Sequence, residues 1–340
     1  MVSPFNYMRK RSVFKLFLLM VCTIFWIAAC SRNSLKQTVS NGDNTTSNAH
    51  PTAVKVVKHA FGETKVPLNP QRVVVLNYPE LDHALGLGVK PVGGPSVEDV
   101  PLHLRDKLKG IENIGTPDGV SLEKILTLKP DLILSNERSA QPIYKMLSGI
   151  APTVVGIANS GEWKQDLKLF ATALNQTERA EKFMENYYAR LNELQAQMGK
   201  KLKQIEVSVV RISPENITLY LEDSFCGTIL QDAGLQRPPA QDLDTSIQAI
   251  KDRSVSVSIS SELLHMADGD VMFLWGWSDD ADSRQALQQL KANPLWSKLN
   301  VVQQSKVYQV PDYWIGSGPL AANAVIEDLF KYLVLNHRSD

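Results

Sequence analysis

The sequence predicts an α/β protein made of two α/β lobes joined by a single long helix, with a ligand cleft between them. Short apolar runs alternate with helical patterns in two blocks, which is the order of β-α-β units. The segment between the blocks shows only helical spacing. With 340 residues, of which 44% are hydrophobic, the chain is long enough for about two domains.

The first block, which we place at residues 55–176, contains three strand patterns. Each is a nearly continuous apolar run, as expected for parallel strands that are covered on both faces. Helical patterns separate the runs. We expect the strands at RVVVL (72–76), DLILS (131–135) and TVVGI (153–157), and the helices around 80–87, 122–128 and 141–150.

A purely helical segment follows, from Glu162 to about Lys203. Asn175-Gln176-Thr177 interrupts it with residues that favour helix caps. Apolar residues then recur at helical spacing over 178–198, about 30 Å at 1.5 Å per residue. A helix of that length can cross a domain boundary, so we expect residues 177–203 to join the lobes.

The second lobe is expected at residues 204–340. Gly316-Ser317-Gly318 resembles the start of a dinucleotide-binding pattern, but no strand with an acidic residue follows it, so we expect a tight turn into a last helix. The strands are predicted at 207–212, 218–222, 271–275 and 307–310, and the helices near 228–233, 261–266, 284–290 and 320–335.

The N-terminus reads as a signal peptide over residues 1–29. A basic stretch from Arg9 to Lys15 precedes a 14-residue apolar run over 16–29, which ends in Ile27-Ala28-Ala29 and is followed by Cys30. This ending resembles the bacterial lipobox, in which the cysteine receives diacylglycerol, so we expect a lipid anchor on Cys30 rather than an uncleaved signal anchor. Residues 30–54 are rich in Ser, Asn and Thr and read as a flexible tether.

Composition argues against several function classes. Lys+Arg and Asp+Glu are both 36, and without a basic block nucleic acid is not an expected partner. The six histidines are scattered without metal-ligand spacing, and no nucleophile motif occurs, so we predict no catalytic residue, no protein-bound metal and no enzyme. Cys226 remains alone in the mature chain and is expected to be a small buried hydrophobe.

Five strings in order resemble the binding proteins of iron-siderophore and cobalamin ABC importers, most closely the ferric-hydroxamate branch. They cover about 55–335 and are NPQRVVVL with DHALGLGVKPVG, IGTPDGVSLEKILTLKPDLIL, NERSAQPIYKMLSGIAPTVV, VSVVRISPENITLYLEDSFCGTILQDAGLQRP, and NPLWSKLNVVQQSKVYQVPDYWIGSGPLAANAVIEDLFKYL.

The resemblance implies a rigid, monomeric, two-lobed lipoprotein that delivers a ferric siderophore to permease subunits and, through them, to an ATPase. We expect a hydroxamate or hydroxamate-citrate chelate, whose own oxygens coordinate iron(III), so the protein needs no cofactor. It is expected to be exported and lipid-anchored to the outer face of the cytoplasmic membrane, or in the periplasm.

Two arginines are candidates for holding an anionic ligand. Arg211 lies in the apolar strand VSVVRI, where a permanent charge is costly unless it meets an anion. It matches an arginine that reaches into the cleft from the second lobe in the family. Arg138 follows a strand end, where ligands gather in open α/β sheets. The alternatives are a structural salt bridge for Arg211 and a solvated surface charge for Arg138.

Aromatic residues follow two strands of the second lobe. An organic chelate would contact such side chains, although each could equally be part of the core. Asn136 and Tyr78 join the candidates because they also lie near strand ends. The aromatic candidates are Trp275, Trp277, Tyr313 and Trp314.

Glu123 and Glu262 are candidates for docking to the permease. Each lies two residues after a serine that could begin a helix, one in each lobe. Related importers present one glutamate per lobe to basic pockets of the permease. Taken singly, each glutamate could simply stabilise the start of its own helix.

Three other functions remain open at this stage. A binder of haem or cobalamin would have the same architecture. An exported lipoprotein hydrolase would need a nucleophile and base that the sequence does not reveal. A scaffold or adhesin would bind no small molecule.

Overall fold

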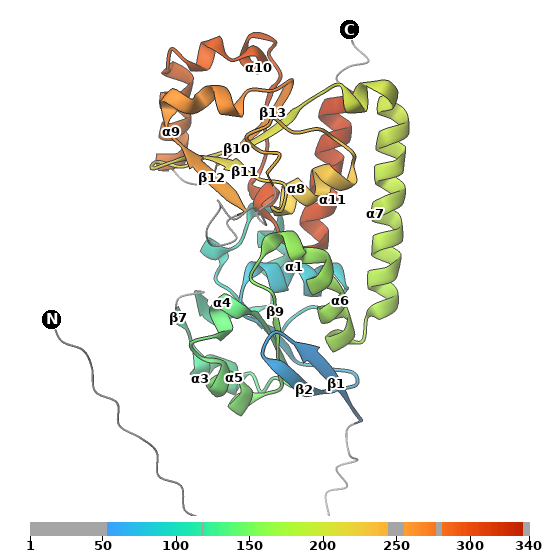
Figure 1. The fold of residues 1–340 in the computed structure, drawn as a ribbon. Helices are drawn as coiled ribbons and strands as arrows, with labels where there is room; N and C mark the ends of the chain where they lie inside the picture. Colours follow the sequence, from blue (N-terminus) through green and yellow to red (C-terminus); the bar gives the residue numbers. More distant parts are fainter. Residues whose placement is uncertain (1–52, 117–118, 244–254, 277–280, 336–340) are drawn as a thin grey trace, which may run out of the picture. The chain divides into compact units, whose positions relative to one another are not determined.

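The computed structural model describes residues 53–116, 119–243, 255–276 and 281–335 (Figure 1). The predicted signal peptide, Cys30, nearly all of the predicted tether and Trp277 lie outside these ranges.

The first lobe is built on a parallel five-stranded sheet with the order β5-β4-β3-β8-β9. Side chains alternate between two cores, because Val73 and Val75 pack in one hydrophobic cluster and Val74 packs in another. The strands are β3 (Val73–Val75), β4 (Gly93–Gly94), β5 (Glu112–Asn113), β8 (Leu132–Asn136) and β9 (Thr153–Gly156).

Helices and two small hairpins complete this lobe. The antiparallel pairs are β1 (Val54–His59) with β2 (Gly62–Pro67) and β6 (Gly115–Thr116) with β7 (Gly119–Val120). The α-helices are α1 (Tyr78–Gly86), α2 (Leu102–Arg105), α3 (Leu122–Thr127), α4 (Glu137–Ala140), α5 (Tyr144–Ile150) and α6 (Trp163–Leu174), and 3₁₀ turns occur at Val97–Asp99, Asp106–Leu108 and Ser160–Glu162.

The long helix α7 (Thr177–Met198) has 22 residues and is therefore about 33 Å long. Near its start, Arg179 Nη1 donates to the carbonyl of Leu87 in the first lobe, 3.0 Å away. Further along, the hydroxyl of Tyr187 donates to Asp232 in the second lobe at 2.6 Å. The helix therefore makes side-chain contacts with both lobes, and a 3₁₀ turn (Gly199–Lys203) follows it.

The second lobe has a mixed five-stranded sheet with the order β12-β11-β10-β13-β14. The last three strands are parallel and the first two pair antiparallel. The strands are β10 (Val207–Ile212), β11 (Ile217–Tyr220), β12 (Ser256–Ile259), β13 (Val271–Trp275) and β14 (Val307–Gln309). The helices are α8 (Phe225–Asp232), α9 (Ala281–Ala292), α10 (Asn300–Gln303) and α11 (Pro319–Leu329), with 3₁₀ turns at Ser261–Ala267, Trp296–Lys298 and Asp312–Ile315 and a π-helical end at Phe330–Leu335.

The predicted fold class is confirmed, with differences in detail. β1 begins at Val54, the last residue assigned to the tether, and the β1–β2 hairpin was missed because only Val57 of β1 and Val66 of β2 are buried. The helix predicted at 261–266 is a 3₁₀ turn. The last helix was predicted to run to Leu335 but is α-helical only to Leu329.

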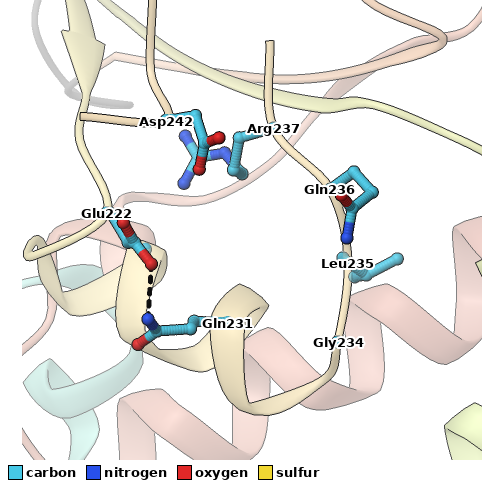
Figure 2. A pocket seen from close by; sticks show the side chains of 8 residues that line it. Glu222, Gln231, Gly234, Leu235, Gln236, Arg237 and Asp242 are labelled. Carbon is cyan, nitrogen blue, oxygen red and sulfur yellow. Dashed lines mark hydrogen bonds between the residues drawn. The ribbon is translucent and has the colours of Figure 1, made fainter. Parts of the chain in front are cut away.

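A cavity of about 160 Å³ lies beside α8 in the second lobe (Figure 2). Arg237 lines it but uses its donors elsewhere: Nε donates to the carbonyl of Val207, and Nη2 donates to the carbonyl of Tyr220 and to Gln241. Its Nη1 has no hydrogen-bond partner in the described part of the chain and is itself inaccessible. Since no candidate from the sequence lines this cavity, we do not assign the ligand site to it.

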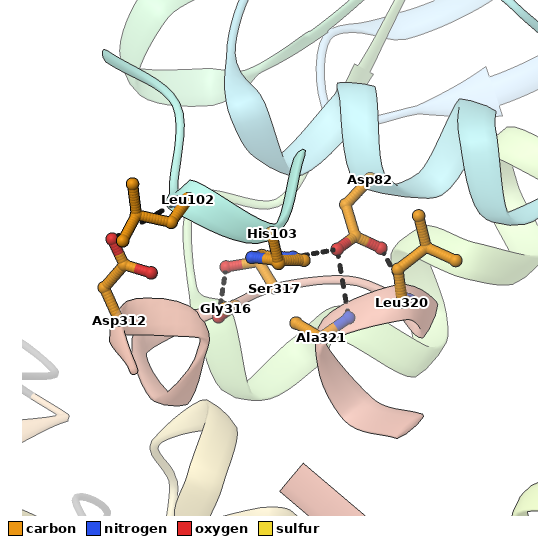
Figure 3. A network of polar contacts seen from close by, with 8 residues as sticks. All are labelled: Asp82, Leu102, His103, Asp312, Gly316, Ser317, Leu320 and Ala321. Carbon is orange, nitrogen blue, oxygen red and sulfur yellow. Dashed lines mark hydrogen bonds and ion pairs between the residues drawn. The ribbon is translucent and has the colours of Figure 1, made fainter. Parts of the chain in front are cut away.

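The two lobes are joined by polar contacts as well as by α7 (Figure 3). Asp82 of α1 accepts hydrogen bonds from the backbone amides of Leu320 and Ala321 at the start of α11, at 2.8 and 3.1 Å. A side chain on Gly318 would collide with Asp82, because a Cβ there would lie 2.3 Å from Oδ1. Gly318 is therefore needed for this close approach, in addition to the predicted turn into the helix.

Candidate functional site

Arg211 and Trp275 lie side by side at the ends of neighbouring strands. They are partners in the parallel register of β10 and β13, so their side chains leave the same face of the sheet. The Arg211 guanidinium carbon lies 5.3 Å from the centre of the Trp275 ring, a cation–π distance. Trp275 is buried, with 2% of its surface exposed, and it supports the partly exposed arginine.

Tyr220 completes the second-lobe half of the site. Its ring centre lies 5.7 Å from that of Trp275, and its hydroxyl forms a hydrogen bond with Arg211. Burial raises the pKa of the Tyr220 hydroxyl, and the positive charge of Arg211 acts against this shift. Two aromatic side chains therefore hold the guanidinium of Arg211. Tyr220 was not predicted from the sequence, because an aromatic residue inside a strand is typical of a core position.

Tyr78 supplies a partly exposed aromatic group from the first lobe. Burial raises the pKa of its hydroxyl to about 12, and the carboxylates of Glu80 and Asp312 add to this shift. The guanidinium groups of Arg211 and Arg138 act in the opposite direction. The hydroxyl therefore lies within electrostatic range of one arginine from each lobe.

Arg138 is exposed on α4, the four-residue helix that begins directly after β8. The predicted position beyond the strand end is therefore the observed one. Asn136 begins this helix, and its side-chain oxygen accepts a hydrogen bond from the amide of Ser139 at 3.2 Å. Its Nδ2 donates to Glu80 at 3.0 Å. Asn136 thus uses both ends of its amide within the lobe.

Glu80 accepts the hydrogen bond from Asn136 and was not predicted as a site residue from the sequence. It is 1% exposed, and burial raises its pKa to about 8. A glutamate in the first turn of a helix is typical of a capping residue, and its contact with Asn136 joins positions 56 apart. Sequence spacing gives no signal for such a contact.

Trp314 is a core residue in this structure. It has no exposed surface, stacks on Phe273 with ring centres 4.4 Å apart, and donates its indole N–H to Asp328 at 2.9 Å. A ligand cannot reach it in this arrangement, so our candidate site omits Trp314. Core packing, the other role expected for such aromatic residues, fits the position of Trp314.

Tyr313 lies at the junction of the lobes, in contact with Asp328 and His103. Its hydroxyl donates to Asp328 at 2.8 Å, and its ring meets that of His103 edge-on at 5.6 Å. Its ring remains partly exposed, so we keep Tyr313 as a peripheral candidate.

Glu123 and Glu262 are exposed and lie in matching positions, one in each lobe. Ser121 begins α3, and its hydroxyl accepts from the amide of Lys124 at 3.3 Å. Ser260 precedes the 3₁₀ turn that contains Glu262, and its hydroxyl helps to lower the pKa of that glutamate. The predicted helix start is therefore present at Glu123, whereas Glu262 lies in a 3₁₀ turn whose preceding serine makes no side-chain cap.

Cys226 is buried, and burial raises the pKa of its thiol, which makes it a poor nucleophile. Across the described residues, we find no cluster of three or more His, Cys, Asp or Glu side chains suited to a metal ion. Within the same ranges, no helix combines the length and apolar character that crossing a membrane requires.

Residues from both lobes match a known protein family. Residues 73–314 match the family described as periplasmic binding protein. The chain belongs to this family. Family members are binding proteins rather than enzymes.

Relatives of this periplasmic binding protein match it over most of its length. The probable siderophore-binding lipoprotein YfiY of Bacillus subtilis is 30% identical over 333 residues, which cover 96% of this chain and 99% of the relative. The iron(3+)-hydroxamate-binding protein FhuD of the same organism is 28% identical over 90% of this chain and 93% of its own.

Solved structures agree with the two-lobed fold. Staphylococcus aureus SirA complexed with staphyloferrin B has a TM-score of 0.72 at 26% identity, covering 82% of this chain and 98% of SirA. Bacillus subtilis FeuA complexed with ferri-bacillibactin has a TM-score of 0.68 at 25% identity, with the same coverage.

Proposed function

We propose that this chain captures a ferric siderophore of the hydroxamate or hydroxamate-citrate type and delivers it to an ABC importer. The observation that carries the proposal is the position of Tyr78, within electrostatic range of Arg138 from the first lobe and Arg211 from the second. Two fixed positive charges beside aromatic side chains suit an organic anion.

The chemistry of a ferric chelate fits these groups. Its iron is already coordinated by the siderophore's oxygens, so the protein needs donors to the outer oxygens and aromatic surface for the organic frame. Arg211 is planar and held by Tyr220 and Trp275, so it can donate two parallel hydrogen bonds to a carboxylate or hydroxamate oxygen pair. Relatives named for siderophore and ferric-hydroxamate binding support this ligand class.

The same proposal includes export and a lipid anchor on Cys30. The relative YfiY, which is named a lipoprotein, supports it. We propose that the anchored monomer works at the outer face of the cytoplasmic membrane or in the periplasm, with permease subunits and their ATPase as partners. It has no catalytic role, and turnover of ester or phosphoester substrates would contradict that part.

Tryptophan fluorescence of the purified mature protein tests the ligand class. The mature chain keeps five of the six tryptophans, because Trp26 lies in the predicted signal peptide, and Trp275 lies against Arg211. We expect saturable quenching by a ferric hydroxamate or hydroxamate-citrate chelate, and weaker or no response to haem and cobalamin. Saturable binding of haem or cobalamin alone, or of none of these compounds, would overturn the proposal.

A further inference from the structure

Glu80 is a buried carboxyl group that joins the starts of two helices. Its Oε2 accepts from the backbone amide of Asn77, the residue before α1, at 3.1 Å. Its Oε1 accepts from Asn136, the residue before α4, at 3.0 Å. Asn77 follows β3 and Asn136 ends β8, which are neighbouring parallel strands. Glu80 thus connects two strand ends at the edge where ligands bind in such sheets.

Two more hydrogen bonds close the network into a ring. Asn77 Nδ2 donates to the hydroxyl of Ser139 at 2.7 Å, and the Ser139 amide donates to Asn136 Oδ1 at 3.2 Å. This arrangement fixes the orientation of the Asn136 amide, because its oxygen must face Ser139 and its nitrogen must face an acceptor. Glu80 supplies that acceptor.

The two helix starts carry the first-lobe half of the candidate site. Tyr78 is the first residue of α1, and Arg138 is the second residue of α4. A helix of four residues has little stability of its own, so its position depends on the contacts that begin it. Those contacts are the ones made by Asn136 and Ser139, and they depend on Glu80.

We propose that Glu80 is a positioning residue that holds Tyr78 and Arg138 in place for the ligand. The identity of that ligand rests on the proposed function, whereas the positioning itself does not. Glu80 acts through Asn136 and Ser139.

Above about pH 8, where Glu80 is a carboxylate and both of its oxygens accept, the variant Glu80→Gln breaks the ring while preserving its shape. If the new amide oxygen accepts from Asn77, the new NH₂ group faces the NH₂ group of Asn136. If the amide turns round, the Asn77 amide loses its acceptor. Asp131→Asn is the control, because Asp131 is a carboxyl of the same lobe that accepts from the Gln71 and Arg72 amides at 2.7 and 2.9 Å, at the opposite end of β8 from the ring.

Hydrogen exchange measured without ligand at pH 9, where Glu80 is ionised, tests the positioning. We expect Glu80→Gln to speed exchange of the Ser139 amide about tenfold, and Asp131→Asn to leave it unchanged. Adding Asn136→Asp to Glu80→Gln exchanges donor and acceptor, since the new amide can donate to the new carboxylate, so protection should return. Unchanged exchange in Glu80→Gln, or no recovery in the double variant, would overturn the positioning role.

Affinity for the ferric siderophore tests whether Glu80 acts through α4. Glu80→Gln should weaken binding about threefold to tenfold, and combining it with Arg138→Ala should cost little more than Arg138→Ala alone. If the losses in binding free energy from Glu80→Gln and Arg138→Ala simply add in the double variant, Glu80 does not act through α4. A parent protein that binds no ferric siderophore would overturn the proposed function instead, and exchange at Ser139 would still test the positioning.

Discussion

Asp82 Oδ2 accepts a hydrogen bond from the backbone amide of Ala321 at 3.1 Å, across 239 positions of sequence and from one lobe to the other. With Leu320 at 2.8 Å on the other oxygen, the carboxylate caps the start of α11. A negative charge at a helix N-terminus is favourable, so this contact stabilises α11 and couples it to α1. The first-lobe helix thus supplies the cap that Gly318, which has no side chain, cannot provide.

The Asp82→Asn variant should lose about 1.5–3 kcal/mol in the free energy of unfolding, because the amide cannot accept from both backbone groups as the carboxylate does. Urea denaturation measures this loss. Hydrogen exchange of the Leu320 and Ala321 amides should rise with it.

Asp131→Asn is the control for Asp82. Asp131 also accepts from two backbone amides, those of Gln71 and Arg72 at 2.7 and 2.9 Å, but entirely within the first lobe. It should leave exchange at the start of α11 unchanged. Equal exchange of Leu320 in both variants would show that Asp82 does not couple the lobes.

Ligand binding should change the arrangement of the lobes little. The continuous helix α7 contacts both lobes through Arg179 and Tyr187, and the Asp82 cap adds a further connection. Such contacts resist the large hinge closure that flexible linkers allow. Solution scattering should therefore give nearly the same radius of gyration with and without ligand, and a pronounced compaction on binding would contradict this expectation.

The pH dependence of stability should differ between the parent protein and Glu80→Gln. Burial raises the pKa of Glu80 from its ordinary value near 4.5 to about 8, so the folded protein keeps a proton that the unfolded chain loses. Proton binding by Glu80 therefore adds to the free energy of unfolding. This contribution is complete below about pH 4.5 and is lost as the pH rises towards 8. Glu80→Gln has no such proton, so its stability relative to the parent should rise across that interval.

Urea denaturation at pH 5, 6, 7 and 8 measures this difference. The neighbouring acidic group is Asp166, whose pKa burial raises to about 7, and it is present in both proteins. Parallel stability curves for the parent and Glu80→Gln would be evidence against a buried, protonated Glu80.

Glu123→Arg combined with Glu262→Arg should leave siderophore affinity and folding intact while reducing uptake and ligand-stimulated ATPase activity sharply. The two exposed glutamates lie one in each lobe, and surface charges of this kind mainly tune encounter and register with a partner. Glu112→Arg with Glu215→Arg is the control, since it reverses one exposed glutamate per lobe elsewhere. Normal uptake by the first pair would show that these residues do not dock the permease.

The sequence predicted those parts of the fold that depend on local patterns. The core strands β3, β8, β9, β10 and β13 are buried nearly throughout, so each appears as an apolar run. The β1–β2 hairpin buries few side chains and left no such run. Its first strand, Val54–His59, was therefore only partly separated from the tether.

A site residue could be predicted from the sequence where its polarity differs from that of the residues around it. Arg211 in an apolar strand is such a case, and the structure places it beside Trp275 and Tyr220, while its role in ligand binding stays a prediction. Glu80 and Tyr220 have ordinary residue types for a helix start and a strand, and their roles arise from contacts with Asn136 and Arg211 that only the fold creates. Trp314 was chosen for its place after a strand, although burial against Phe273 makes it a core residue.

The affinity of Arg211→Ala for the ferric siderophore tests the central claim most directly. Arg190→Ala is the control, because Arg190 pairs with Glu327 and Glu193 away from the site. Loss of a charge-assisted hydrogen bond should cost about 1.5–3 kcal/mol, or roughly tenfold to a hundredfold in Kd, with Arg211→Lys also weaker than the parent because it lacks the planar fork. Parental affinity in folded Arg211→Ala would contradict the assignment of the ligand to this site.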